Sequence, residues 1–149
     1  MNVLIEINVA KRVFLTALCC YFGIRANFAL KTKVTMIKSI KNAEHYKWGD
    51  NCDGWHLLKT DSLSVIQEKM PPGAFEKRHF HREAQQLFYI LSGTATFDME
   101  GEAFILSAGE SIHVPKGAKH FISNHGSAEL GFLVVSEPKS HGDRTEVNL

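Results

Sequence analysis

The sequence predicts an all-β fold, and three observations carry that prediction. From Asp61 onward, turn residues recur about every 8–16 positions, as expected of short strands joined by tight connections. β-branched and aromatic residues fill the intervals, and no segment of this region has a convincing helical period. Regular short strands are typical of a sandwich or barrel, and eight of them suffice for a double-sheet jelly roll.

Six of the eight expected strands end near a turn signal. In chain order the strands and the turns that follow them are Leu63–Lys69 before Pro71-Pro72-Gly73, Phe75–His81, Gln86–Leu91 before Ser92-Gly93, Thr94–Met99 before Glu100-Gly101, Ala103–Leu106 before Ala108-Gly109, Ser111–Val114 before Pro115-Lys116-Gly117, His120–Ser123 before His125-Gly126, and Leu130–Val135. Glycine supplies positive φ in such turns, and proline withholds a backbone donor where a strand ends.

Alternation along these strands predicts which side chains line the interior. Side chains two positions apart share one face of a strand. Phe75 and Lys77 are therefore expected to face inward together with the two histidines that follow them. Phe88 and Ile90 are expected to share the face of Gln86. The predicted interior is mostly apolar with a few polar groups, as small-molecule pockets usually are.

The chain length of 149 residues fits one domain better than two. We expect three parts: an N-terminal extension over residues 1–35, a barrel over 36–136 and a polar tail over 137–149. The tail lacks periodicity, so it is expected either to be disordered or to wrap an edge of the barrel. Charge supports the first boundary, because residues 1–42 hold seven basic residues against one acidic residue, whereas the chain as a whole has a net charge of only +1.

The N-terminal extension allows three interpretations. The basic pair Lys11-Arg12 precedes the apolar run Val13–Ile24, which is similar to a secretory signal or anchor but lacks a convincing cleavage site. This run is shorter than the roughly 20 residues of a membrane-spanning helix. Translation could instead begin at Met36, or the segment could form an accessory helix or strand. The N-terminal residue of protein from the native source would separate these interpretations.

Composition excludes several classes of function. The near-neutral net charge and the lack of a DNA-binding segment give no support for a nucleic-acid partner, and no membrane partner is expected. The three cysteines, of which Cys19 and Cys20 are adjacent, form neither a disulfide framework nor a CxxC motif. A reducing compartment fits best, so a cytoplasmic location is expected unless residues 1–35 prove to be a signal peptide.

Three histidines are the candidate metal ligands. His79 and His81 share one strand face, and His120 begins another strand after a Pro-x-Gly turn. Neutral imidazole is a good ligand for iron, nickel, copper and zinc. Alone, the HxH pair could equally be two surface histidines on a strand.

The spacing around these histidines resembles the two motifs of the cupin superfamily. The first motif, G(x)5HxH(x)3–4E(x)6G, is similar to the set Gly73, His79, His81, Gln86 and Gly93. The second, G(x)5PxG(x)2H(x)3N, is matched at every spacing by Gly109, Pro115, Gly117, His120 and Asn124. The chain looks like the small single-domain conserved-barrel cupins (cupin 2 type). The resemblance implies a double-stranded β-helix, or jelly-roll, barrel with one divalent transition metal ion (Fe, Mn, Ni, Zn or Cu), and a homodimer.

Gln86 departs from the family pattern, because the family's acidic ligand position falls on this neutral residue. A glutamine carbonyl oxygen can ligate but leaves the divalent ion with its full charge. Glu83 would be an alternative ligand if the strand continued past His81, although a solvated turn carboxylate is the simpler interpretation. Lys77 and Phe88 are the candidate substrate-binding residues, with a rim lysine as the alternative for Lys77.

The resemblance implies a small-molecule partner but does not choose an activity. Related cupins include dioxygenases, isomerases, epimerases and decarboxylases, and a fold alone does not decide among them. We expect a metal-dependent enzyme of dioxygenase or isomerase type, with no second general base visible in the sequence. The rival hypothesis is a non-catalytic cupin that binds or senses a small molecule. A structural or partner-binding barrel is a third possibility.

Overall fold

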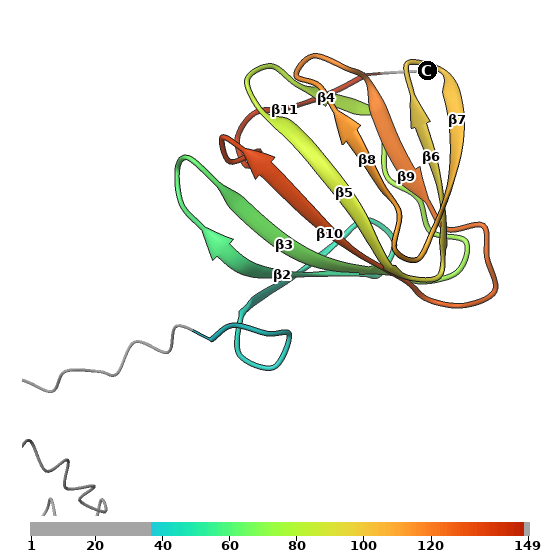
Figure 1. Ribbon diagram of the computed structural model, residues 1–149, viewed down its shortest axis with the longest axis horizontal. Helices are drawn as coiled ribbons and strands as arrows, with labels where there is room; N and C mark the ends of the chain where they lie inside the picture. Colours follow the sequence, from blue (N-terminus) through green and yellow to red (C-terminus); the bar gives the residue numbers. More distant parts are fainter. Residues whose placement is uncertain (1–36, 148–149) are drawn as a thin grey trace, which may run out of the picture. The chain divides into compact units, whose positions relative to one another are not determined.

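The computed structural model of the protein describes residues 37–147, which form two antiparallel β-sheets (Figure 1). The strands are β1 (Glu44–Trp48), β2 (Cys52–Lys59), β3 (Ser64–Met70), β4 (His79–His81), β5 (Gln85–Ser92), β6 (Thr94–Met99), β7 (Glu102–Ser107), β8 (Ser111–Val114), β9 (His120–Ser123), β10 (Leu130–Glu137) and β11 (Arg144–Glu146). Within the same residues, no helix has the length and apolar character needed to cross a membrane. The residues of the expected N-terminal extension, 1–35, lie outside the described part.

The two sheets face each other as the layers of a jelly roll. The six-stranded sheet has the order β1-β2-β3-β10-β5-β8, and the five-stranded sheet has the order β11-β4-β9-β6-β7. In Figure 1, β3, β10 and β5 run side by side across one layer, with β9, β6 and β7 forming part of the other. The predicted all-β jelly-roll fold is therefore confirmed.

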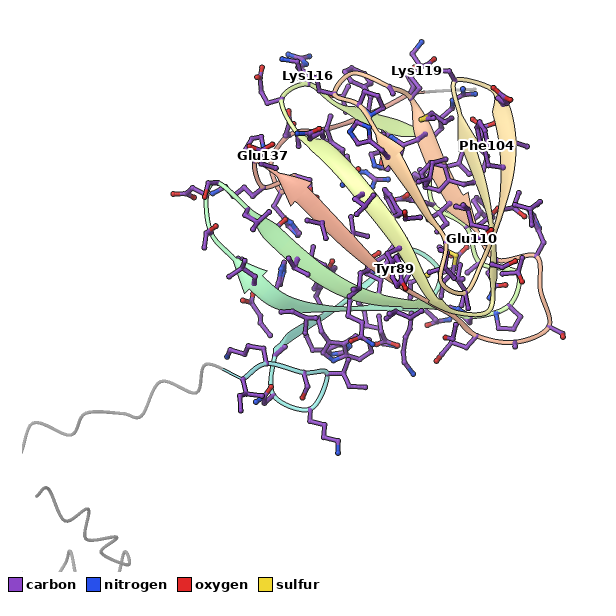
Figure 2. All side chains as sticks on the ribbon, in the orientation of Figure 1. Tyr89, Phe104, Glu110, Lys116, Lys119 and Glu137 are labelled. Atoms are coloured by element: carbon purple, nitrogen blue, oxygen red, sulfur yellow. The ribbon has the colours of Figure 1, made fainter. Side chains whose placement is uncertain are left out.

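Side chains from both sheets fill the space between them (Figure 2). Along β5 the residues alternate between exposed and buried, and Gln86, Phe88 and Ile90 point inward as the sequence predicts. The Phe88 ring packs 4.9 Å from the Phe97 ring and 6.1 Å from the Phe132 ring, measured between centroids. Full burial of each such side chain stabilises the fold by roughly 1.5–3 kcal/mol.

Asn124 fixes two loops at one end of the barrel. Its buried amide nitrogen donates to the carbonyls of Met70 and Ala128, both at 2.9 Å, and its side-chain oxygen accepts the amide of Gly126. The backbone carbonyl of Asn124 also accepts the amide of Gly73 at 2.8 Å. These bonds give the motif asparagine a structural role.

All eight predicted strands are present in the structure, but one of them was predicted to be much longer than it is. The expected strand Phe75–His81 is reduced to the three residues of β4, and the residues before it form only an isolated bridge at Phe75. Because this segment is not a regular strand, its side chains do not alternate as predicted. Phe75 is 55% exposed, so the prediction that it faces inward is wrong.

Three strands have no counterpart in the sequence prediction. β1 and β2 extend the six-stranded sheet beyond β3, and the short strand β11 pairs with β4 at the edge of the five-stranded sheet. The tail after residue 136 therefore wraps an edge of the barrel, which is one of the two alternatives stated for it.

Candidate metal centre

The histidines at 79, 81 and 120 converge on one point inside the barrel. They lie on adjacent strands, because β4 pairs with β9 and His79 is directly opposite His120. One ring nitrogen from each histidine lies within 4.8 Å of those of the other two. All three side chains are buried, so the HxH pair is not a surface feature.

Backbone carbonyls fix the orientation of two of these rings. The Nδ1 atom of His79 lies 2.9 Å from the Lys77 carbonyl oxygen, and that of His120 lies 3.0 Å from the Ala118 carbonyl oxygen. A carbonyl oxygen only accepts, so each Nδ1 carries the hydrogen and each Nε2 keeps its lone pair. This tautomer is the one in which Nε2 can bind a metal ion.

Burial keeps the three imidazoles neutral. Desolvation lowers the pKa of each to about 4, with the charge of Arg144 as the next cause for His79, and the neighbouring His79 as the next cause for the other two. A neutral imidazole is the form that binds metal ions. The site is therefore prepared to ligate at neutral pH without first losing a proton.

The fourth candidate ligand comes from the opposite sheet. Gln86 is buried on β5, and its Nε2 atom donates to Ser136 Oγ at 3.2 Å. Its Oε1 atom is buried and has no hydrogen-bond partner among residues 37–147, and the same holds for His120 Nε2. Two buried acceptors without donors fit a cation as their missing partner. Glu83, the alternative ligand, is exposed in the turn after β4.

The two candidate substrate-binding residues lie in different surroundings. Phe88 is buried in the core, with its ring 5.8 Å from that of His120. The prediction that Lys77 faces the interior is wrong, because its side chain is 74% exposed and pairs with Glu146 at 3.5 Å outside the barrel. Figure 2 shows that Lys116 and Lys119, on the loop before β9, also point away from the barrel.

Glu76 is an interior residue that the sequence reasoning missed. Because residues 76–78 do not continue the strand, Glu76 turns inward instead of Lys77, and its Oε1 atom lies 3.8 Å from His79 Nε2. Desolvation raises the pKa of its carboxyl group, and the Arg144 guanidinium opposes that effect. No spacing rule signals Glu76, since its orientation depends on where β4 begins.

A second interior carboxylate lies on β3. Glu68 accepts a hydrogen bond from the Tyr46 hydroxyl at 2.9 Å, across the sheet from β1. Burial, and then the charge of Glu76, raise the pKa of Glu68 to about 8. The interior thus holds two acidic groups whose pKa values burial raises, and the sequence alone does not reveal them.

Comparisons with known proteins agree with this geometry. A family model described as a cupin domain matches residues 66–136. An oxalate-binding protein of Thermotoga maritima is 34% identical over 85 residues, which cover 54% of this chain and 70% of that protein. The chain belongs to the cupin family.

Other relatives share the barrel in different settings. A mannose-1-phosphate guanylyltransferase of Salmonella montevideo is 32% identical over 64% of this chain, but this cupin spans only 20% of that enzyme's length. The solved structure of KdgF from Halomonas sp. superposes with a TM-score of 0.64 over 69% of this chain and 94% of that chain. At 18% identity, this similarity supports the fold alone.

Proposed function

We propose that this cupin is a metal-dependent enzyme that acts on a small molecule, with one divalent ion held by His79, His81 and His120 and with Gln86 as the fourth ligand. The observation that carries the proposal is the convergence of three buried, neutral imidazoles within 4.8 Å. A bound transition metal ion supplies Lewis-acid or redox chemistry at coordination positions that the protein leaves free.

The protein's own groups prepare the site in three ways. The carbonyls of Lys77 and Ala118 accept the Nδ1 hydrogens of His79 and His120, so the lone pair of each ring lies on Nε2. The aromatic side chains around His120 exclude water on the core side, since the Phe97 ring stacks on this imidazole at 5.8 Å. The interior carboxyl group of Glu68, with its pKa raised to about 8, can accept or return a proton, which favours catalysis over binding alone.

The second candidate function is binding without turnover. The relative from Thermotoga maritima is named an oxalate-binding protein, and its 34% identity makes it the specific support for this alternative. Small oxygen-rich anions are natural partners for a divalent ion whose protein ligands are all neutral.

Metal binding is tested first. We expect the purified protein to take up one divalent ion per chain, and His79→Ala or His120→Ala to reduce affinity at least tenfold, because each removes one of three ligands. Isothermal titration with Mn²⁺, Fe²⁺ and Zn²⁺ measures this. His113→Ala is the matched control, since His113 is exposed on β8 and contacts Gln85 instead. Equal affinity in all variants would falsify the site.

Turnover then separates the two functions. Oxygen uptake by the Fe²⁺-loaded protein is measured with a panel of phenols, thiols and keto acids, alongside isomerisation assays with sugar substrates. Turnover that His81→Ala abolishes supports the enzyme. Saturable binding of a small anion with no turnover across the panel supports the binding protein.

A further inference from the structure

Arg144 reaches the candidate metal centre from the edge strand β11. Its Nη1 atom donates to Glu76 Oε1 at 2.7 Å and lies 3.3 Å from His79 Nε2, and its Nη2 atom donates to the Lys77 carbonyl at 3.1 Å. The side chain is 35% exposed, so the guanidinium lies at the boundary between the interior and solvent.

The Arg144 guanidinium contacts His79 Nε2, the atom through which this ring would bind a metal ion. The His79 Nδ1 atom is already engaged with the Lys77 carbonyl, which leaves the Nε2 lone pair as the only ligating position of this ring. Arginine has no acceptor and stays charged, so Arg144 can only donate to that lone pair. One lone pair serves one partner, and a divalent ion and Arg144 therefore exclude each other at His79.

Glu76 is the negatively charged partner of Arg144 at this site. Its Oε1 atom lies 2.7 Å from Arg144 Nη1 and 3.8 Å from His79 Nε2. Its Oε2 atom is buried and has no hydrogen-bond partner among the described residues. The carboxylate side chain is only 12% exposed. A buried carboxylate that loses its cation without replacement is strongly destabilising.

We propose that Arg144 is an exchangeable cation of the metal centre: it occupies His79 Nε2 and neutralises Glu76 until a divalent ion displaces it and takes Glu76 as its counter-charge. Glu76 then supplies the negative charge that Gln86 lacks. The inference rests on the proposed function, because it takes the three histidines as a metal site.

The test compares metal dissociation constants at fixed pH and ionic strength, measured for Zn²⁺ and Mn²⁺ by competition with a chromophoric chelator. Arg144→Met keeps the apolar stem and removes the charge, so affinity is expected to rise about tenfold, within the range usual for residues around metal ligands. Glu76→Gln is expected to lower affinity by about the same factor. Opposite signs for two partners of one ion pair distinguish cation exchange from a merely structural contact.

Two further variants guard the interpretation. Arg78→Met is the matched control. Arg78 directly precedes β4, but its guanidinium pairs with Asp98 at 3.3 Å, so the metal affinity of this variant is expected to equal that of the parent. Arg144→Lys keeps the charge, so it is expected to bind metal as the parent does. Circular dichroism and thermal melting establish that each variant folds.

The outcomes separate the two proposals. If the parent binds metal through His79 but Arg144→Met does not bind more tightly, the exchange is overturned and the metal centre stands. If Arg144→Lys tightens binding as much as Arg144→Met, charge is not the cause and the exchange is also overturned. If neither the parent nor Arg144→Met binds metal, both proposals fail.

Discussion

Gln86 uses the two ends of its amide for different purposes. The nitrogen is engaged with Ser136 Oγ, and the oxygen remains free in the interior. A glutamate in the same place would bring a charge but lose the donor. Ser136 can compensate by donating its own hydroxyl, although that hydroxyl now donates to Ser140 Oγ at 3.2 Å.

This arrangement predicts the effect of restoring the carboxylate. In Gln86→Glu, we expect divalent metal affinity to rise at least about tenfold, because an anionic ligand neutralises part of the ion's charge. Without metal, the same variant should be less stable than the parent, because a charged side chain is then buried without a cation. Chelator competition measures the first effect, and thermal melting in excess EDTA measures the second. Gln85→Glu, exposed on the same strand, is the control for the affinity measurement. An unchanged affinity would show that Gln86 does not face the ion.

Single residues also show where sequence reasoning stops. The histidines, Gln86 and Asn124 could be predicted because their motif spacing fixes their places on the barrel. Glu76 could not, because its inward orientation depends on a strand that begins four residues later than the alternation indicates. Arg144 lies in a polar segment without any pattern, and only strand pairing brings it to His79.

Among the strands, β4 depends most on its neighbours. It has three residues, and the turn that follows it is held by Asp143, whose carboxylate accepts the backbone amides of Arg82, Glu83 and Ala84 at 3.1, 3.0 and 2.9 Å. These bonds come from the residue just before β11. The C-terminal segment therefore both flanks the ligand strand and shapes the turn between β4 and β5.

Removal of this carboxylate should loosen the turn. For Asp143→Ala we expect a loss of about 2 kcal/mol in the free energy of unfolding, because three backbone donors lose a charged acceptor. Asp143→Asn keeps one acceptor oxygen and should lose less. Urea denaturation gives these values, and metal affinity should fall in parallel because the turn places His81. A denaturation curve for Asp143→Ala that coincides with the parent's would contradict the assignment.

Strand prediction succeeded where the period-two pattern of β5 and β6 faces the core. It missed the edge strands β1 and β11 and also β2, which lies between β1 and β3. β5 and β6 match the predicted segments because buried residues alternate over positions 85–91 of β5 and 94–97 of β6. β1 and β11 are mostly exposed along their length, so no apolar alternation marks them in the sequence. Edge strands of this kind are defined by backbone pairing, which residue types do not reveal.

At the scale of the whole barrel, pH should change stability through the buried titratable groups. The pKa of each of the three histidines falls from about 6.5 in the unfolded chain to about 4 in the fold. Below pH 6.5 the unfolded state therefore binds more protons, and stability falls toward pH 4. Burial also lowers the pKa of His56, which adds to this loss. The raised pKa of Glu68 acts in the opposite direction, since the folded state then holds a proton that the unfolded state releases.

We expect the metal-free protein to lose at least about 1 kcal/mol of unfolding free energy between pH 6.5 and pH 5. His120→Gln should flatten this dependence, and Glu68→Gln should steepen it, because each removes one of two opposing contributions. Urea midpoints in excess EDTA, measured across this range, provide the check. Slopes that move in the same direction for both interior variants would contradict the assignment.

The homodimer implied by the family resemblance stays a prediction. The outer side of β5 exposes apolar residues that could take part in such a contact, and Tyr89, labelled in Figure 2, is 37% exposed there. Light scattering on the purified protein would establish the number of subunits.

The pairing between β4 and β9 would give the proposed metal ion a mechanical role. These strands share a single register pair, His79 opposite His120, whereas β9 and β6 share four. An ion bound by both histidines cross-links the five-stranded sheet at its weakest seam, and it closes a loop of about forty residues as a disulfide would. If the proposed ion binds, the metal supply of the cell would then set the resistance of this protein to proteolysis.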